Sequence, residues 1–311
     1  MAKIIGPGSL NVDITGYAPH LPVAGETTKG TTLRFSAGGK GSNQMVAAHR
    51  AGAEALLIGQ RGADVLGDIL GKFYAAEGIS ECYITATREN ETGSALIEID
   101  GRDGQNRIIV IPGANEKVGR ESVLGAEKDF ADADAVLTQF ETTVEAVLAA
   151  KELAQKYGKP FILNPAPHID VDKKVFDGVD FVTPNESEAE QFTGVKVAST
   201  EDCRKAAAAF FEMGVKNVII TLGSRGAYFT DGKREVLVPC LKMKAVETTG
   251  AGDAFNGGFA TAIAEGRDVE TALKFATCTA AISVTRLGAA TSMPERHEIE
   301  ALLQKEFGII L

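Results

Sequence analysis

The sequence predicts an α/β protein in three layers, with helices on both faces of a doubly wound, mostly parallel β-sheet, and with a small β-sheet lid. From about residue 134 to 223, short apolar runs alternate with helical periodicity, which is the pattern of parallel strands buried on both faces. Two extended regions, 12–37 and 92–112, interrupt this rhythm. We expect them to pair into the lid, although ordinary surface hairpins would explain the same pattern.

The individual elements follow from apolar periodicity and from the glycines that end helices. Strands are expected near 3–8, 55–59, 135–140, 161–164, 180–184 and 217–223. Extended runs near 93–99 and 106–111 flank a turn at 100–104 and indicate a hairpin. Helices are expected between Gly39 and Gly52, over 65–78 and 143–157, from Glu186, and over 201–213, 251–265, 268–286 and 295–306.

Length and composition restrict the class of protein. The 311 residues suit one large domain, and we expect a single domain over 1–311. The net charge of −10 argues against nucleic acid and anionic membranes as partners, because such a surface repels polyanions. No apolar run reaches the roughly 20 residues of a membrane span, and a signal-peptide core is missing. The four scattered cysteines predict neither a disulfide framework nor a zinc site, so a cytoplasmic location is expected.

Polar residues stand at the carboxyl ends of the predicted strands, where ligands bind in open α/β sheets. They are Asn11, Asp13, Glu141, Asn164, Asn185, Thr221 and Gly223. Each residue alone is explained as a helix cap or a turn residue. Because several strand ends would contribute to one crevice, together they indicate a ligand site.

A glycine pair, Gly38-Gly39, leads through Lys40 into the first predicted helix. Glycine lets a ligand approach the backbone closely, and a helix N-terminus offers unpaired N–H groups. A lysine is disfavoured at this positive helix end. Lys40 therefore indicates an electron-rich partner such as a sugar hydroxyl or a phosphate; a solvated surface lysine is the alternative.

The most specific segment is the turn Gly250-Ala251-Gly252-Asp253, which opens another helix. Its consecutive N–H groups point at one place and form an anion hole. Phosphoryl transfer needs such a hole, and a carboxylate that accepts the proton of the attacking hydroxyl. Asp253 can supply that carboxylate, and we expect the helix dipole to keep it ionised. A plain capping aspartate is the alternative.

Asn185 and Glu188 lie three residues apart at a helix start, so their side chains can share one face. Such a pair suits Mg²⁺ bound through water. A capping box explains the same spacing equally well.

Other motifs are missing or incomplete. The P-loop pattern G-x-x-x-x-G-K-[ST] is absent. Gly6-Pro7-Gly8 lacks the third glycine and the immediate helix of a dinucleotide fingerprint, so an NAD-linked oxidoreductase is a disfavoured alternative. No metalloprotease, α/β-hydrolase or protein-kinase signature occurs.

With these motifs the chain resembles the ribokinase-like (phosphofructokinase B-type) sugar kinases over almost its whole length. The resemblance rests on GGKGSNQ at 38–44, TTGAGDAF at 248–255, PGAN at 112–115, NPAP at 164–167, TPNESEAE at 183–190 and TLGSRG at 221–226. It implies an ATP- and Mg²⁺-dependent kinase that phosphorylates the primary hydroxyl of a pentose, with ribose expected first. The lid of this family often forms the dimer contact, which implies a homodimer.

The resemblance also implies roles for individual residues. Asp253 matches the base, and Gly250, Ala251 and Gly252 match the anion hole. The expected sugar-binding residues are Asn11, Asp13, Gly39, Lys40, Asn43 and Glu141. The expected ATP-binding residues are Asn185, Thr221, Gly223, Ser224, Gly226 and Thr277, and Glu188 is expected to reach Mg²⁺ through water.

One departure concerns a monovalent cation. These kinases commonly carry Asp at a position associated with K⁺, where this chain has Glu247. The other candidate cation ligands, acting largely through backbone carbonyls, are Thr249, Ser283, Arg286, Gly288 and Ser292. Because the extra methylene lengthens the reach of the carboxylate, we expect weaker activation by K⁺.

Several alternatives stay open at this point. A 2-deoxyribose, a ketohexose or a nucleoside could replace ribose, because specificity depends on the groups around one or two hydroxyls. A non-catalytic sugar sensor on the same fold is a different class of function. The intact Asp253 and its glycine turn argue against it, since a binding protein needs no positioned base.

Overall fold

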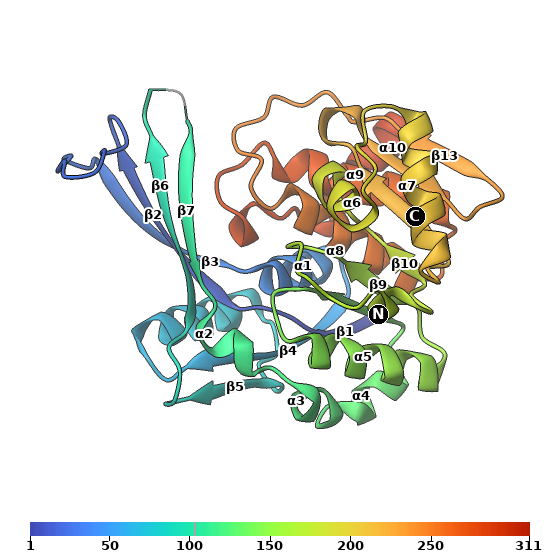
Figure 1. The fold of residues 1–311 in the computed structure, drawn as a ribbon, viewed down its shortest axis with the longest axis horizontal. Coiled ribbons are helices and arrows are strands. Elements are labelled where there is room, and N and C mark those ends of the chain that lie inside the picture. Colours follow the sequence, from blue (N-terminus) through green and yellow to red (C-terminus); the bar gives the residue numbers. More distant parts are fainter. Residues whose placement is uncertain (103) are drawn as a thin grey trace.

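The computed structural model describes residues 1–102 and 104–311; Asp103, inside the predicted turn at 100–104, lies outside the described residues. The larger of two sheets holds nine strands (Figure 1). In order across this sheet they are β13 (Glu235–Val238), β12 (Ala227–Thr230), β11 (Val218–Thr221), β10 (Phe181–Val182), β9 (Phe161–Asn164), β8 (Ala135–Gln139), β1 (Lys3–Pro7), β4 (Glu54–Gly62) and β5 (Ile84–Thr87). Strands β11 through β5 are parallel, and β12 and β13 add antiparallel at one edge. The predicted mostly parallel sheet is confirmed.

Helices cover both faces of the large sheet, which confirms the three layers. One face carries α1 (Lys40–Arg50), α2 (Val65–Glu77), α8 (Ala251–Ala264), α9 (Val269–Ser283) and α10 (Arg296–Phe307). The other carries α3 (Arg120–Leu124), α4 (Glu127–Asp132), α5 (Val144–Tyr157), α6 (Glu186–Thr193) and α7 (Thr200–Glu212). Short 3₁₀ turns lie at Gly113–Lys117, Lys173–Phe176, Gly223–Arg225 and Ala290–Ser292.

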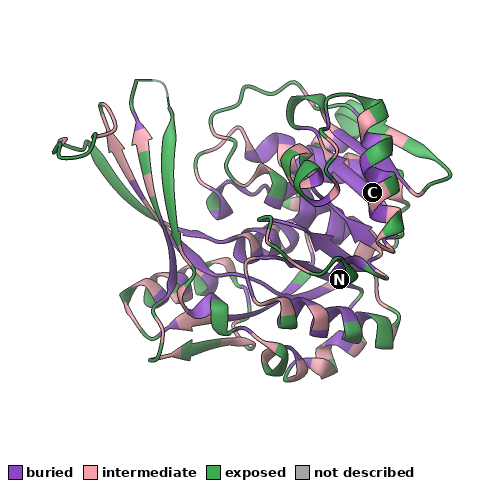
Figure 2. Ribbon diagram, viewed as in Figure 1, coloured by how far each residue is buried: buried purple, intermediate pink, exposed green. Residues whose placement is uncertain are grey.

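Two hydrophobic cores separate the sheet from its helix layers, and Figure 2 shows the buried residues running through the central strands. Successive strand residues enter opposite cores, because side chains alternate along a strand: Ile4 of β1 joins one core and Ile5 the other. Strands buried on both sides read as continuous apolar runs, which is why they could be predicted. Within the described ranges, no helix combines the length and apolarity that crossing a membrane requires.

The elements that were not predicted are the short ones. Helices α3 and α4 have 5 and 6 residues, too few for a helical period to show. Strands β5, β12 and β13 have 4 residues each. Strand β10 has 2 residues where 180–184 was expected. Pro184, which has no N–H to donate to a neighbouring strand, lies just beyond it.

The second sheet contains β3 (Thr32–Gly38), β2 (Asn11–Ala18), β6 (Gly93–Asp100) and β7 (Asn106–Ile111), in that order. The predicted hairpin is the antiparallel pair β6–β7, and β2 pairs antiparallel with β3. Because β2 and β6 run parallel to each other, the two extended regions form one sheet and are not separate surface hairpins. This sheet projects from the body of the molecule (Figure 1).

Helices α1 and α8 lie against each other at unusually close range. A Cβ atom added to Gly257 of α8 would lie 2.5 Å from the Ala47 Cβ and 2.5 Å from the Gln44 carbonyl oxygen of α1. At its other side, α1 meets the chain after β1: a Cβ on Gly41 would lie 2.4 Å from the Gly8 Cα. Only glycine fits at these contacts, so α1 is held between β1 and α8.

This packing predicts that Gly257→Ala destabilises the protein. Helix propensity alone would make alanine better by about 1 kcal/mol at this position. Overpacking costs about 1–3 kcal/mol, so we expect a lower urea midpoint. Gly16→Ala, where the added Cβ would meet only the Ile97 carbonyl oxygen at 4.0 Å, is the matched control. A Gly257→Ala protein as stable as the wild type would contradict the close contact.

Candidate active site

The predicted base, Asp253, lies in the first turn of α8 and is only 6% exposed. Its two carboxylate oxygens each accept a hydrogen bond from α1. The Gln44 Nε2 donates to Oδ1 at 3.0 Å, and the Asn43 Nδ2 donates to Oδ2 at 2.9 Å. The close α1–α8 contact therefore brings a predicted sugar-binding residue, Asn43, onto the carboxylate.

The turn before Asp253 has the backbone shape expected of an anion hole, with one difference. Gly250 has φ 79° and precedes the helix, which starts at Ala251. The Ala251 N–H donates to the Thr248 carbonyl at 3.2 Å, so this amide of the predicted hole is already engaged. The amides of Gly252 and Asp253 follow at positions where a helix has no carbonyl for them. A Cβ on Gly252 would meet nothing within 4 Å among the described residues, so a ligand can approach there.

Burial acts on the Asp253 carboxyl in the direction opposite to the helix dipole considered in the sequence analysis. Burial raises the pKa of this carboxyl, and the Lys40 charge and the amides of Asn43 and Gln44 oppose the rise without cancelling it. Desolvation is the largest of these effects because the side chain is almost completely removed from water. Asp253 therefore holds a proton more readily than an exposed aspartate does.

Lys40 begins α1, as predicted, and belongs to this charged group. Burial lowers its pKa, but the charges of Asp253, Glu141 and Glu188 outweigh that effect, so the pKa of Lys40 is raised overall. Its ammonium group therefore lies in the negative field of three carboxylates, and the side chain is half-buried.

Glu141 contacts the start of α1 and also contributes negative charge near Lys40. Its Oε2 accepts the Lys40 backbone N–H at 2.9 Å and the Ser9 hydroxyl at 2.5 Å, and the Ser9 Oγ accepts the Gly41 N–H at 3.2 Å. A carboxylate is favourable at a helix N-terminus. Glu141 thus holds the start of α1 against the chain after β1.

The small sheet contributes Asn11 and Asp13 from the start of β2. A Cβ on Gly38 would lie 2.3 Å from the Asp13 Oδ2, so glycine is required where the Asp13 carboxylate crosses β3. Gly39, with φ 87°, then turns the chain into α1. The pKa of Asp13 is raised to about 7 by burial and by the negative charges of Glu141, Asp253 and Glu247.

Asn11 is oriented by a residue to which no role was assigned. The Asn115 Nδ2 donates to the Asn11 Oδ1 at 2.8 Å, while the Asn115 Oδ1 accepts the Leu10 N–H at 2.8 Å. A Cβ on Gly93 would lie 2.2 Å from the Asn115 Nδ2. The small sheet is thereby attached to the turn after β7.

Asn185 and Glu188 form the capping box, as the alternative explanation had it. The Glu188 N–H donates to the Asn185 Oδ1 and the Asn185 N–H donates to the Glu188 Oε2, both at 2.8 Å. The capping box uses Oε2 of Glu188, and Oε1 accepts no hydrogen bond within residues 1–102 and 104–311. Burial raises the pKa of Glu188, Lys40 opposes that rise and Asp253 adds to it, so this carboxyl belongs to the same charged group.

The remaining residues predicted to bind nucleotide lie farther along the edge of the large sheet. Thr221 ends β11 and bridges to Asn185. Gly223 and Ser224 follow in an exposed 3₁₀ turn that ends at Gly226, with φ 102°. Thr277 of α9 is buried, and its Oγ1 has no partner among residues 1–102 and 104–311.

Of the predicted cation ligands, Glu247 and Gly288 are in direct contact. The Glu247 Oε2 accepts the Gly288 N–H at 2.9 Å. The Arg286 side chain instead pairs with Glu298. The hydroxyls of Ser283 and Ser292 donate to carbonyls of their own chain segments, at 2.9 and 2.8 Å, and Thr249 is exposed.

Several buried polar residues that support the site were not assigned a role from sequence. They are Ser9, Gln44, Asn115, Gln139, Thr183 and Asn256, and they are joined by Asn164, which was expected at the ligand crevice. Gln44, Asn115, Asn164 and Thr183 lie inside the motifs quoted above, and that position was the available signal. Their partners come mostly from distant segments, as with Leu10 and Asn115, which are 105 positions apart, and a sequence pattern does not reveal such pairs.

Known proteins match this chain along nearly its full length. The profile described as pfkB family carbohydrate kinase matches residues 1–296. The ribokinase of Haemophilus influenzae is 37% identical over 96% of this chain and 97% of its own. The deoxyribokinase of Salmonella typhimurium is 34% identical over 95% of this chain and 97% of its own. The structure of Arabidopsis thaliana ribokinase complexed with ribose and ATP is 31% identical, with a TM-score of 0.92, over 98% of this chain and 99% of that one.

A base candidate at a glycine turn, the fold, and these full-length matches agree. The chain belongs to the pfkB family of carbohydrate kinases.

Proposed function

We propose that this protein transfers the γ-phosphate of ATP to the primary hydroxyl of ribose, giving ribose 5-phosphate. The observation that carries the proposal is the position of Asp253. A buried carboxylate, aligned by two amides, directly follows an open glycine turn at a helix N-terminus. A pure sugar-binding protein would have no need of this arrangement. The relatives named ribokinase support ribose as the sugar.

Each group has a task in the transfer. Asp253 accepts the proton of the attacking hydroxyl, and its raised pKa makes it a stronger base than an exposed aspartate. The amides of Gly252 and Asp253 and the ammonium of Lys40 stabilise the negative charge on the transferred phosphoryl group. When bound, Mg²⁺ neutralises phosphate charge. Glu188, with its Oε1 outside the capping box, suits the second-sphere role of holding a metal-bound water.

The sugar and the nucleotide occupy opposite sides of Asp253 in this proposal. Asn11, Asp13 and Asn43, with Gly39 and Glu141 beside them, bind the sugar hydroxyls. The Asn43 Oδ1 is buried without a partner in the described part of the chain, so a hydroxyl donor would satisfy it. Thr221, Ser224, Gly226 and Thr277 bind ATP along the edge formed by β11 and α9.

Asp253→Asn tests the base directly. Asparagine has nearly the shape of aspartate but cannot accept the hydroxyl proton, so a role other than that of the base predicts unchanged activity. Loss of a general base instead lowers kcat/KM by about 10²–10⁴-fold. We expect that loss when ATP consumption is measured across ribose, 2-deoxyribose, ketohexoses and nucleosides, with ribose giving the highest wild-type kcat/KM.

Each result of this panel has a separate meaning. Full activity in the variant would remove Asp253 as the base. A higher kcat/KM for 2-deoxyribose than for ribose would contradict the substrate. No ATP turnover with any compound would favour the sugar sensor.

We also propose that K⁺ activates this enzyme weakly. The Glu247 carboxylate already accepts the Gly288 N–H at 2.9 Å, across the segment that supplies the other candidate ligands. The longer side chain reaches this amide, so its oxygen is less available to a cation.

The K⁺ proposal predicts similar rates in KCl and in tetramethylammonium chloride at equal ionic strength. Glu247→Asp, which shortens the side chain by one methylene, is expected to increase the stimulation by KCl. If KCl stimulated the wild-type protein strongly, and as much as it stimulates Glu247→Asp, the proposal would be refuted.

We propose that the small sheet is a lid and that its partner is a second copy of this chain. We also propose that the chain is a single domain located in the cytoplasm. Register places Phe35, Ile14, Leu96 and Ile109 in one row across its four strands. Phe35 is 51% exposed and Ile109 is 63% exposed. A contiguous apolar face of this kind marks an interaction surface.

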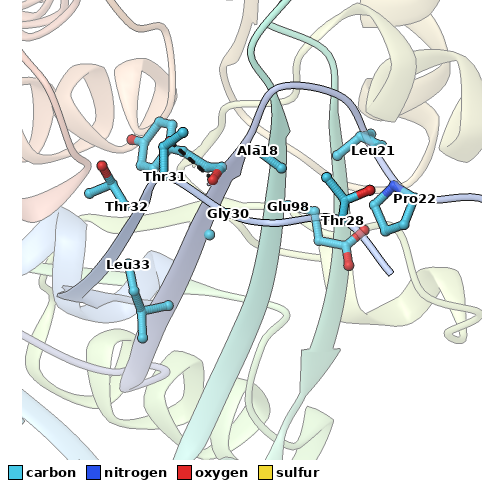
Figure 3. A pocket seen from close by; sticks show the side chains of 11 residues that line it. Ala18, Leu21, Pro22, Thr28, Gly30, Thr31, Thr32, Leu33 and Glu98 are labelled. Atoms are coloured by element: carbon cyan, nitrogen blue, oxygen red, sulfur yellow. Dashed lines mark hydrogen bonds between the residues drawn. The ribbon is translucent and has the colours of Figure 1, made fainter. Parts of the chain in front are cut away.

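A hollow of about 450 Å³ adjoins the same sheet, and Figure 3 shows side chains that line it. The lining residues come from β2, from β3 and the connection before it, and from β6, and they include Leu33 and Glu98. Register puts Leu33 and Glu98 in one row with Gly16, two residues from the Phe35 row and therefore on the same face. None of the predicted site residues lines the hollow, so we assign it to the dimer contact and not to catalysis.

Phe35→Asp is expected to convert a dimer to a monomer, because it puts a charge into the apolar row. Sedimentation velocity over a range of concentrations measures this. Leu237→Asp, at an exposed leucine on β13 (52% exposed), is the matched control and should leave the mass unchanged. A wild-type protein that stays monomeric at high concentration would contradict the proposed partner.

A further inference from the structure

Hydrogen bonds connect Asp253 and its turn to four buried amide side chains, those of Gln44, Gln139, Asn164 and Asn256. Gln44 bonds to Asp253 itself. Gln44 and Gln139 are both 0% exposed. The Gln44 Nε2 donates to the Asp253 Oδ1 and to the Asn164 Oδ1, both at 3.0 Å. The Gln44 Oε1 accepts from the Gln139 Nε2 at 2.9 Å. Both N–H groups and the oxygen of Gln44 are therefore engaged, so its amide has one orientation.

The hydrogen bonds continue from Asn164 and return to the same turn of α8. The Asn164 Nδ2 donates to the Thr183 carbonyl at 3.0 Å, and the Thr183 hydroxyl donates to the Asn256 Oδ1 at 2.6 Å. The Asn256 Nδ2 then donates to the Gly252 carbonyl at 2.9 Å. Because Gly252 precedes Asp253 in the chain, the hydrogen bonds form a closed circuit around the base and its amide turn.

We propose that Gln44 is a positioning residue that aligns the Asp253 carboxylate with the hydroxyl it deprotonates and with the amide turn beside it. The inference rests on the function proposed above. Gln44 differs from its neighbour Asn43 in the hydrogen-bond partners of its side-chain amide. The Asn43 Oδ1 lacks a partner in the described part of the chain and can meet substrate, whereas the polar atoms of Gln44 are all bonded to protein.

Two consequences follow from removing the Gln44 amide. The carboxylate would keep only the Asn43 bond and could rotate about its Cβ–Cγ bond, and a displacement of about 1 Å at a reacting group costs about 10²-fold in rate. The ionised form of Asp253 would also lose a hydrogen-bond donor, which raises the pKa of Asp253 further. The charged groups that face Asp253 from the other elements stay in place: Asp13 of β2, Lys40 of α1, Glu141 after β8 and Glu188 of α6.

Gln44→Met, which keeps the length of the side chain and removes its amide, tests the proposal with ribose and ATP. We expect kcat to fall by about 10–100-fold. The KM values of both substrates should stay within about threefold, because Gln44 contacts neither. In the pH profile of kcat/KM, activity falls at low pH because a protonated base cannot accept a proton. The midpoint of this acid limb should move to higher pH by about one to two units.

Two further variants separate positioning from simple loss of stability. Gln139→Met leaves both donor bonds of Gln44 intact but removes the partner of its Oε1, so the acid limb should move in the same direction by less. Thr279→Val removes a buried hydroxyl that donates to the Phe275 carbonyl of the same helix, α9, at 2.9 Å, outside the circuit. This control should lose stability and keep the wild-type acid limb.

The outcomes are distinct. An unmoved acid limb and unchanged kcat in Gln44→Met would overturn the inference while the kinase function stands. If Gln44→Met does not fold, Gln139→Met decides, and a wild-type limb there overturns the inference. Absence of sugar-dependent ATP turnover in the wild-type protein would overturn the proposed function, and the inference with it.

Discussion

The burial of the Asp253 carboxylate is the constraint on which the surrounding structure depends. A carboxylate removed from water is costly unless hydrogen bonds or an opposite charge replace its hydration. Asn43 and Gln44 supply one bond to each oxygen, and Lys40 supplies the charge. All three come from the first turns of α1, so that helix must start within reach of α8. The glycine contact at Gly257 is what permits this approach.

The start of α1 is in turn held from outside the helix. Glu141 and Ser9 bond its first amides, and the close contact of Gly41 with Gly8 seats it against the end of β1. The same carboxylate of Glu141 adds to the negative charge around Asp13 and Asp253. One side chain therefore both fixes the helix and strengthens the field in which the base works. Substituting Glu141 would thus disturb structure and electrostatics together.

The fold could be predicted largely from the sequence because its strands are buried on both faces and its helices end at glycines. Those patterns are local, and they failed only for elements such as α3 and β12 that are too short to show a period. The site was predicted less completely. The glycine turns with Lys40 or Asp253 can be recognised from a short stretch of sequence. The contacts of Gln44, Gln139 and Asn115 cannot, because their partners lie in distant segments. The spacing of Asn185 and Glu188 fitted both a cap and a metal ligand. The capping box uses one oxygen of Glu188, so the second oxygen does not take part in it.

The pKa of Asp253 shows why local reasoning about charge was insufficient. The helix dipole and the Lys40 charge both favour the ionised form, yet burial prevails. Burial depends on the packing of α1 against α8, which is a property of the tertiary structure. A base with a raised pKa accepts a proton more strongly, and the amide donors limit how far the pKa rises, so that the ionised form is still available. The two amide donors on Asp253 thus meet two opposing needs of the proposed base, and the buried circuit through Gln44 supplies one of them.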